Sequence, residues 1–163
     1  MSELAISEGK PAVTIRNPER WTPPVEEEKE MALASAFYAV KVGPGDEIIT
    51  PTLGYLGTYC GALHLGARPV FCDIDPDTLL IDPEDVIKRI TKRTRAIVPI
   101  HFWGNVCDMD ALMDIGKRYG IAIVEDAAHA HGAEWDGKKL SLIHISEPTR
   151  PRLSSYAVFC LKK

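Results

Sequence analysis

The stretch that most constrains the fold is residues 121–132, IAIVEDAAHAHG. Four apolar residues there are followed by two carboxylates, Glu125 and Asp126, and then by two histidines, His129 and His131. Such an apolar run is typical of a strand buried in a parallel sheet. Ligands of open α/β sheets bind just beyond the carboxyl ends of the strands. We therefore expect Asp126 and His129 to lie where such a fold carries out its chemistry.

Strand-like and helix-like segments alternate along the chain before this stretch. Asp82 before Pro83 is typical of a helix start, and Asp108 and Gly120 fit the two ends of a second helix. The expected strands are 47–50, 69–74, 95–100 and 121–125, and the expected helices are 31–40, 55–65, 83–90 and 108–119. This alternation predicts an α/β fold, a mostly parallel sheet flanked by helices.

Three expected strands are followed by side chains with functional potential. They are Tyr55 and Tyr59 after the first strand, the His-Phe-Trp run at 101–103 after the third, and Asp126, His129 and His131 after the last. An aromatic ring, a carboxylate and an imidazole at one edge of a sheet suit a flat heteroaromatic cofactor. More ordinary roles stay open: Tyr55 in the core, His101 held by backbone groups, and Asp126 as a helix cap.

A metal site is a second functional hypothesis. Glu125, Asp126, His129 and His131 all carry groups that bind metals, so a metal-dependent hydrolase that uses His129 and His131 is an alternative. Spacing alone does not separate this alternative from a cofactor site.

Residues 140–163, LSLIHISEPTRPRLSSYAVFCLKK, show neither helical nor alternating periodicity. Residues 140–150 resemble the translation of a transposase-type sequencing adapter, and residues 155–163 resemble its far end. We therefore expect an artefactual tail without structure and assign no function to it. Without the tail the chain carries 15 Lys and Arg against 22 Asp and Glu, a net charge of −7, which argues against nucleic-acid or membrane-surface binding.

The rest of the chain suffices for one domain, expected at residues 31–139 after an N-terminal segment at 1–30. No apolar run approaches the ~20 residues of a membrane span, and the first ten residues have no apolar signal core, so a cytoplasmic location is expected. Cys60, Cys72 and Cys107 are odd in number and widely spaced. We expect reduced, buried thiols rather than disulfides or a zinc site.

Three motifs, GDEIITP, GARPVFCDIDPDT and EDAAHAHGA, occur in this order. Together they resemble the DegT/DnrJ/EryC1/StrS family of sugar aminotransferases, and the resemblance covers about residues 31–140. It implies the partial large domain of a fold-type-I aminotransferase that depends on pyridoxal 5′-phosphate (PLP).

The resemblance also implies roles for three residues. Asp126 would pair with the pyridine nitrogen of PLP and keep it protonated, so that the ring accepts electrons. His129 would donate a hydrogen bond to the phenolic oxygen of the cofactor. Tyr55 matches the aromatic residue that stacks on the ring, and a structural hydrogen-bonding role is expected for His131.

Two parts of the family pattern do not occur. The family has a Ser-Gly-Thr-like segment that binds the PLP phosphate before the helix at 31–40, where this chain has EEEKE at 26–30. The family's Schiff-base lysine follows the GKKL segment, where the tail begins here, and we expect Lys138 and Lys139 to belong to a surface turn. We therefore expect a fragment that lacks transaminase activity.

For the parent protein the resemblance implies a homodimer that moves an amino group from glutamate or glutamine to a nucleotide-linked keto-sugar or a keto-cyclitol. A relative that binds PLP or a nucleotide sugar without catalysis is an alternative.

Overall fold

A computed structural model describes residues 6–7, 10–11, 34–130, 133–140 and 159–162. Its centre is a five-stranded sheet in the order β4-β3-β5-β6-β9. The first four strands in this order are parallel, and the last pairs antiparallel. The strands are β3 (Glu47–Pro51), β4 (Arg68–Cys72), β5 (Thr94–Ile97), β6 (Ala122–Asp126) and β9 (Phe159–Lys162). The predicted α/β class with a mostly parallel sheet is confirmed.

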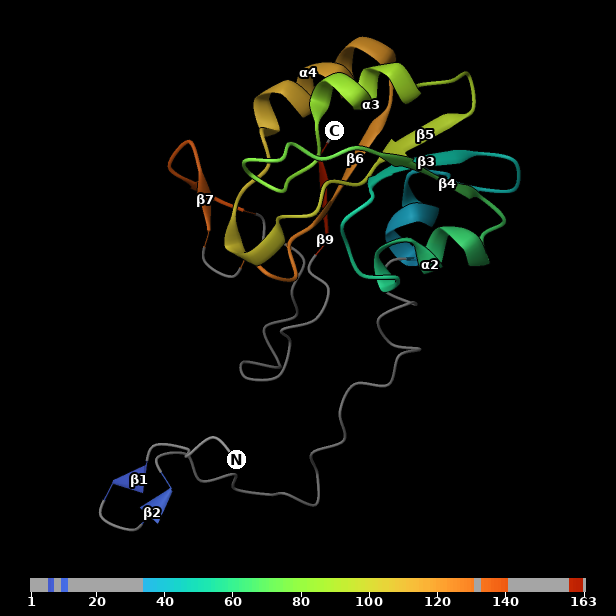
Figure 1. Cartoon of the computed structure of the whole chain (residues 1–163). Helices are drawn as coiled ribbons and strands as arrows, with labels where there is room; N and C mark the ends of the chain where they lie inside the picture. The colour runs from blue at the N-terminus through green and yellow to red at the C-terminus, as the bar shows by residue number, and fades with distance from the viewer. Residues whose placement is uncertain (1–5, 8–9, 12–33, 131–132, 141–158, 163) are drawn as a thin grey trace.

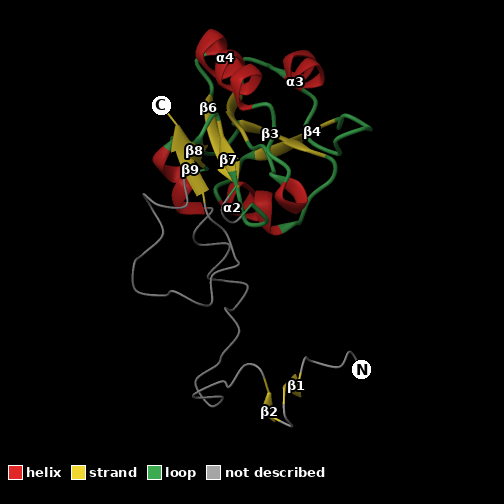
Figure 2. Cartoon of the chain, turned by 90° about the vertical axis from the view of Figure 1, so that its left-hand side faces the viewer, coloured by secondary structure: helices red, strands yellow, loops and turns green. Residues whose placement is uncertain are grey.

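Helices cover both faces of this sheet. They are α2 (Gly57–His64), α3 (Pro83–Arg89), α4 (Met109–Tyr119), the 3-10 helix η2 (Phe102–Gly104) and a helix at residues 34–39. Figures 1 and 2 show α3 and α4 on one face and α2 on the other. Two small hairpins lie outside the sheet: β1 (Ile6–Ser7) with β2 (Lys10–Pro11), and β7 (Glu134–Trp135) with β8 (Lys138–Lys139).

The strands are apolar at successive positions because both faces of the sheet are buried. Ile49, Ile97 and Ile123 belong to the core under α3 and α4. Their neighbours Ile48 and Val124 belong to a second core with residues of α2 and the helix at 34–39. Side chains alternate between the faces of a strand, so β3, β5 and β6 each contribute to both cores.

The capping residues act as predicted. The Asp82 carboxylate accepts from the Glu84 amide at 2.8 Å, and that of Asp108 accepts from the Ala111 amide at 3.0 Å. Gly120 ends α4 with φ of 70°, a left-handed conformation that favours glycine. These caps set the start of α3 at the expected Pro83 and that of α4 at Met109, directly after its cap.

Several boundaries differ from the prediction. Helix α2 begins at Gly57 rather than at Tyr55, and its N-cap, Leu56, has no side chain that could have marked the start in the sequence. Strands β4 and β5 end before Ile74 and Ile100, which form isolated bridges with Ile81 and Asp126 instead.

Strand β9 lies in the segment that we expected to be without structure. It pairs with β6 from Ile123, opposite Lys162, to Asp126, opposite Phe159. Without this strand β6 would be an edge strand with unpaired N–H and C=O groups, which almost any extended segment can satisfy. The pairing therefore needs no special sequence in the tail.

No helix in the described part of the chain is long and apolar enough to cross a membrane.

Candidate functional site

Asp126 is the last residue of β6 and lies at the edge where the parallel strands end. Its amide donates to the Pro99 carbonyl at 2.8 Å, and its own carbonyl accepts from the His101 amide at 3.0 Å. These two bonds extend the pairing between the segment after β5 and the end of β6. As predicted, the ends of these strands meet at one edge of the sheet.

The two adjacent carboxylates point to opposite faces of the sheet, as the alternation of side chains along a strand requires. The Asp126 carboxylate faces α2, where its Oδ2 accepts from Thr58 Oγ1 at 2.6 Å. The Glu125 carboxylate is fully buried on the other face, where its Oε2 lies 3.2 Å from His101 Nε2. Glu125 and Asp126 therefore cannot bind the same ion.

His101 belongs to the interior rather than to the open edge. The Cys107 amide donates to its Nδ1 at 3.1 Å, so the ring proton is on Nε2 and is donated to Glu125. The expectation that backbone groups hold His101 is therefore confirmed for Nδ1, whereas Nε2 contacts the side chain of Glu125. Beside it, burial raises the pKa of the Cys107 thiol to about 12, and this thiol donates to the Ile100 carbonyl at 3.2 Å.

Of the two tyrosines after β3, Tyr55 is the one that remains open to a ligand. Its side chain is 59% exposed, so it is not a core residue. The ring lies against the backbone of Gly57, where a Cβ would come within 2.9 Å of a ring carbon. Tyr59 instead packs edge-on against Phe71, with 5.3 Å between ring centroids.

His129 lies in the turn after β6 and is exposed. Its ring centroid is 5.6 Å from that of Phe102 in η2, which brings the segment after β5 next to this turn. Trp103 is 73% exposed at the same place. His131, the other histidine of the motif, lies outside the described residues, as does the segment at 26–30.

Thr58 was missed by the sequence analysis although it makes the shortest contact to Asp126. It is 2% exposed and lies three residues after Tyr55, in the first turn of α2. No local signal marks this residue in the sequence, because the start of α2 has no capping side chain and the contact depends on where α2 packs.

The metal hypothesis receives no support from the residues that the structure describes. Glu125 and Asp126 diverge, His129 is exposed, and no group of three or more metal-binding side chains gathers in the described part of the chain. Cys72 and Cys107 are buried, and Cys60 is half-buried, as expected for the first two.

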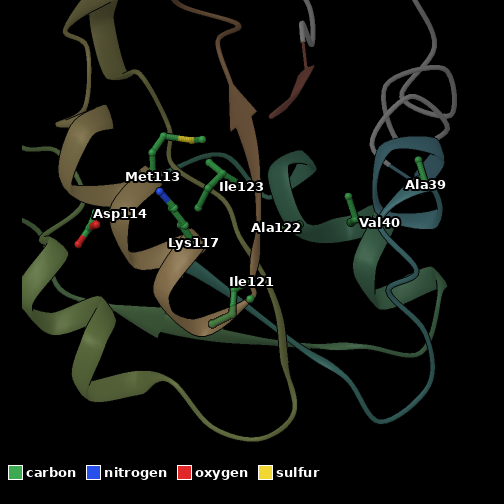
Figure 3. A pocket seen from close by; sticks show the side chains of 10 residues that line it. Ala39, Val40, Met113, Asp114, Lys117, Ile121, Ala122 and Ile123 are labelled. Atoms are coloured by element: carbon green, nitrogen blue, oxygen red, sulfur yellow. The ribbon is translucent and has the colours of Figure 1, made fainter. Parts of the chain in front are cut away.

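An open cleft of about 850 Å³ lies elsewhere, between α4 and the helix at 34–39 (Figure 3). Figure 3 shows Met113 and Lys117 on one side, Ala39 and Val40 on the other, and Ile121 at its base. The cleft is at the start of β6, whereas Asp126 is at its end. The cleft is therefore not part of the candidate site around Asp126.

The chemistry of the donor set at the edge fits a protonated heteroaromatic ring. Both oxygens of the Asp126 carboxylate accept from neutral donors, Thr58 Oγ1 and the Ala128 amide at 3.1 Å, and each keeps a further lone pair. The carboxylate is 8% exposed, so a charged ring N–H would meet it in a largely water-excluded place. Tyr55, three residues before Thr58, offers an exposed flat ring.

This arrangement defines an α/β domain with a candidate ligand site at the carboxyl ends of its parallel strands. The chain belongs to the DegT/DnrJ/EryC1/StrS aminotransferase family, whose model matches residues 30–144.

Several solved structures share the fold. 3-Amino-5-hydroxybenzoic acid (AHBA) synthase is 42% identical with a TM-score of 0.67, and the match covers 69% of this chain and 29% of that one. DesV of S. venezuelae has the same identity and TM-score, with 69% and 30% covered. Spr1654 from Streptococcus pneumoniae, assigned as a sugar aminotransferase and solved in its PLP form, is 34% identical with a TM-score of 0.62, with 68% and 32% covered. The chain thus spans less than a third of these proteins.

Proposed function

We propose that this domain holds the pyridine ring of PLP at Asp126 and that its parent protein is a PLP-dependent transaminase. The observation that supports this most directly is the buried Asp126 carboxylate at the end of β6, fixed by Thr58 and the Ala128 amide. The PLP form of Spr1654, a structure with the same fold, adds support.

The cofactor, when bound, supplies an electron-accepting pyridinium ring. Asp126 holds the proton on the ring nitrogen, because an ionised carboxylate nearby favours the protonated form. Tyr55 would pack against the ring and exclude water from it. His129 would donate a hydrogen bond to the phenolic oxygen.

For the parent protein we propose amino transfer from glutamate or glutamine to a nucleotide-linked keto-sugar or a keto-cyclitol. We further propose a cytoplasmic homodimer. The assignment of Spr1654 as a sugar aminotransferase supports the sugar, whereas AHBA synthase, also similar to this chain, is named for a different product.

The chain as written should bind the ring without turning over substrate, because it lacks the Ser-Gly-Thr-like segment and the lysine motif. Any PLP-dependent amino transfer by this purified chain would refute that part of the proposal. We also propose that the artefactual tail lies within residues 140–163, although the match to the family model extends to residue 144. Long reads across the gene at residues 30–31 and 140 test this, and reads that reproduce the chain as written would overturn it.

The binding proposal is tested with pyridoxamine 5′-phosphate (PMP), which needs no lysine for attachment. We expect Asp126→Asn to raise the Kd of PMP by about tenfold or more, the value of a hydrogen bond between charged groups. Asp114→Asn is the matched control, because Asp114 is exposed and lies at the cleft of Figure 3. Equal Kd values for Asp126→Asn and the wild type would refute the proposed site. A weaker affinity for PMP in Asp114→Asn alone would place the binding site at the cleft instead.

A further inference from the structure

Thr58 connects the Asp126 carboxylate to α2. The two residues are 68 positions apart in the sequence, and Thr58 Oγ1 donates to Asp126 Oδ2 at 2.6 Å. Both side chains are buried, with 2% and 8% exposed. A hydrogen bond from a hydroxyl to a carboxylate at this distance is charge-assisted and about twice as strong as a neutral one.

The other contacts of Asp126 come from its own strand region. Its Oδ1 accepts from the Ala128 amide, and its backbone bonds to the segment that contains Pro99 and His101. In the described part of the chain, Thr58 is therefore the one side chain on another element that fixes the carboxylate. Without this hydroxyl the carboxylate could turn about its side-chain torsions while the backbone stayed in place.

Thr58 is also tied to the aromatic platform. Its amide donates to the Tyr55 carbonyl at 3.0 Å, and the Tyr55 ring lies against Gly57. One short segment thus carries both the exposed ring and the hydroxyl that binds Asp126. The contact therefore fixes the carboxylate relative to the segment that carries Tyr55.

We propose that Thr58 is a positioning residue: its hydroxyl holds the Asp126 carboxylate in the plane where it meets the ring nitrogen of the cofactor. This inference rests on the proposed function, since it presumes that Asp126 binds that nitrogen. If Thr58 acts in this way, losing its hydroxyl weakens the binding of the ring nitrogen but not the stacking of the ring.

The test compares two probes, PMP and its deaza analogue in which carbon replaces the ring nitrogen. Thr58→Val removes the hydroxyl at nearly constant volume, and Thr58→Ser keeps it. Thr50→Val is the matched control: Thr50 is also fully buried, and its hydroxyl donates to the Val98 carbonyl at 3.5 Å. Folding of each variant is checked by circular dichroism, and Thr58→Ala replaces Thr58→Val if valine prevents folding.

We expect Thr58→Val to raise the Kd of PMP by about tenfold and that of the deaza analogue by less than about twofold, with Thr58→Ser and Thr50→Val close to the wild type. The ¹⁵N resonance of labelled PMP should show the ring nitrogen losing its proton in Thr58→Val. A similar loss for both probes would make Thr58 a merely structural residue and overturn the inference. So would an unchanged Kd for PMP. If the wild type itself binds PMP no better than the deaza analogue, the pairing of Asp126 with the ring nitrogen fails, and both proposals fall together.

Discussion

Replacing His101 tests how much its buried hydrogen bonds, next to the candidate site, contribute to stability. Its imidazole is completely buried and makes two hydrogen bonds, one donated to Glu125 Oε2 at 3.2 Å and one accepted from the Cys107 amide at 3.1 Å. The change His101→Leu removes both bonds at similar volume. The backbone amide of residue 101 still donates to the Asp126 carbonyl, so the local chain path is kept.

The expected cost follows from these two bonds. Losing a hydrogen bond to a buried carboxylate costs about 1.5–3 kcal/mol, and leaving a buried amide without an acceptor costs about 1–3 kcal/mol. We therefore expect His101→Leu to lower the free energy of unfolding by about 4 kcal/mol. With a urea slope of about 2 kcal/mol per M, the unfolding midpoint falls by about 2 M.

Two further variants separate the bonds. His101→Asn places an acceptor near the position of Nδ1 and can keep the bond from Cys107. His101→Gln places a donor near the position of Nε2 and can keep the bond to Glu125. Each should recover about half of the loss, measured by urea unfolding followed by circular dichroism at pH 7. A cost below about 1 kcal/mol for His101→Leu would show that this geometry contributes little to stability, and no recovery in either variant would refute the two-bond account.

The other predictions concern charge, a buried thiol and helix packing. The pKa of Glu47 is lowered, first by the hydrogen bond from Thr91, so its stabilising effect is present above the ordinary pKa of 4.5 and is lost as the pH falls. Urea midpoints between pH 5 and 3 should therefore drop further in the wild type than in Glu47→Gln, and parallel curves would contradict this. The pKa of Cys107 is raised by burial to about 12 from 9.0, so its contribution is complete below pH 9 and is lost as the pH rises. Between pH 8 and 10.5 the wild type should lose about 2 kcal/mol more than Cys107→Ala, and an equal loss would refute the assignment. Gly116→Ala should destabilise the protein by about 1 kcal/mol or more in thermal unfolding, although alanine favours a helix by about that amount, because the new Cβ would lie 2.9 Å from the Ile121 carbonyl oxygen. A higher Tm for this variant would show that α4 can shift.

Local chemistry explains which parts of the fold could be predicted from the sequence. Asp108 and Gly120 gave the limits of α4 because side-chain caps and left-handed glycines act within one turn of the chain. The start of α2 could not be found in this way, because Leu56 offers no capping group. The tail strand β9 was also missed, since its pairing depends on the open edge of β6 and not on its own sequence.

In the candidate site, too, the features that depend on local sequence could be predicted and the long-range contact could not. Asp126 could be predicted because it directly follows an apolar run, and the meeting of strand ends is a property of any parallel sheet. Side chains alternate along a strand, so the sequence alone already places Glu125 and Asp126 on opposite faces and excludes an ion bound by both. The contact between Thr58 and Asp126 depends on where α2 packs across the sheet, which no local pattern in the sequence records.

The span of the Thr58–Asp126 contact has a consequence for the order in which the molecule forms. The contact joins residues 68 positions apart across three parallel strands, β3, β5 and β6. Contacts of such long sequence separation form slowly, because the intervening chain must lose its freedom first. During synthesis the hydroxyl of Thr58 emerges from the ribosome long before its acceptor does. Competence to bind the ring should therefore appear in one late step, after β6 has joined the sheet, and a nascent chain that stops before residue 126 should have an ordered α2 without any ligand site.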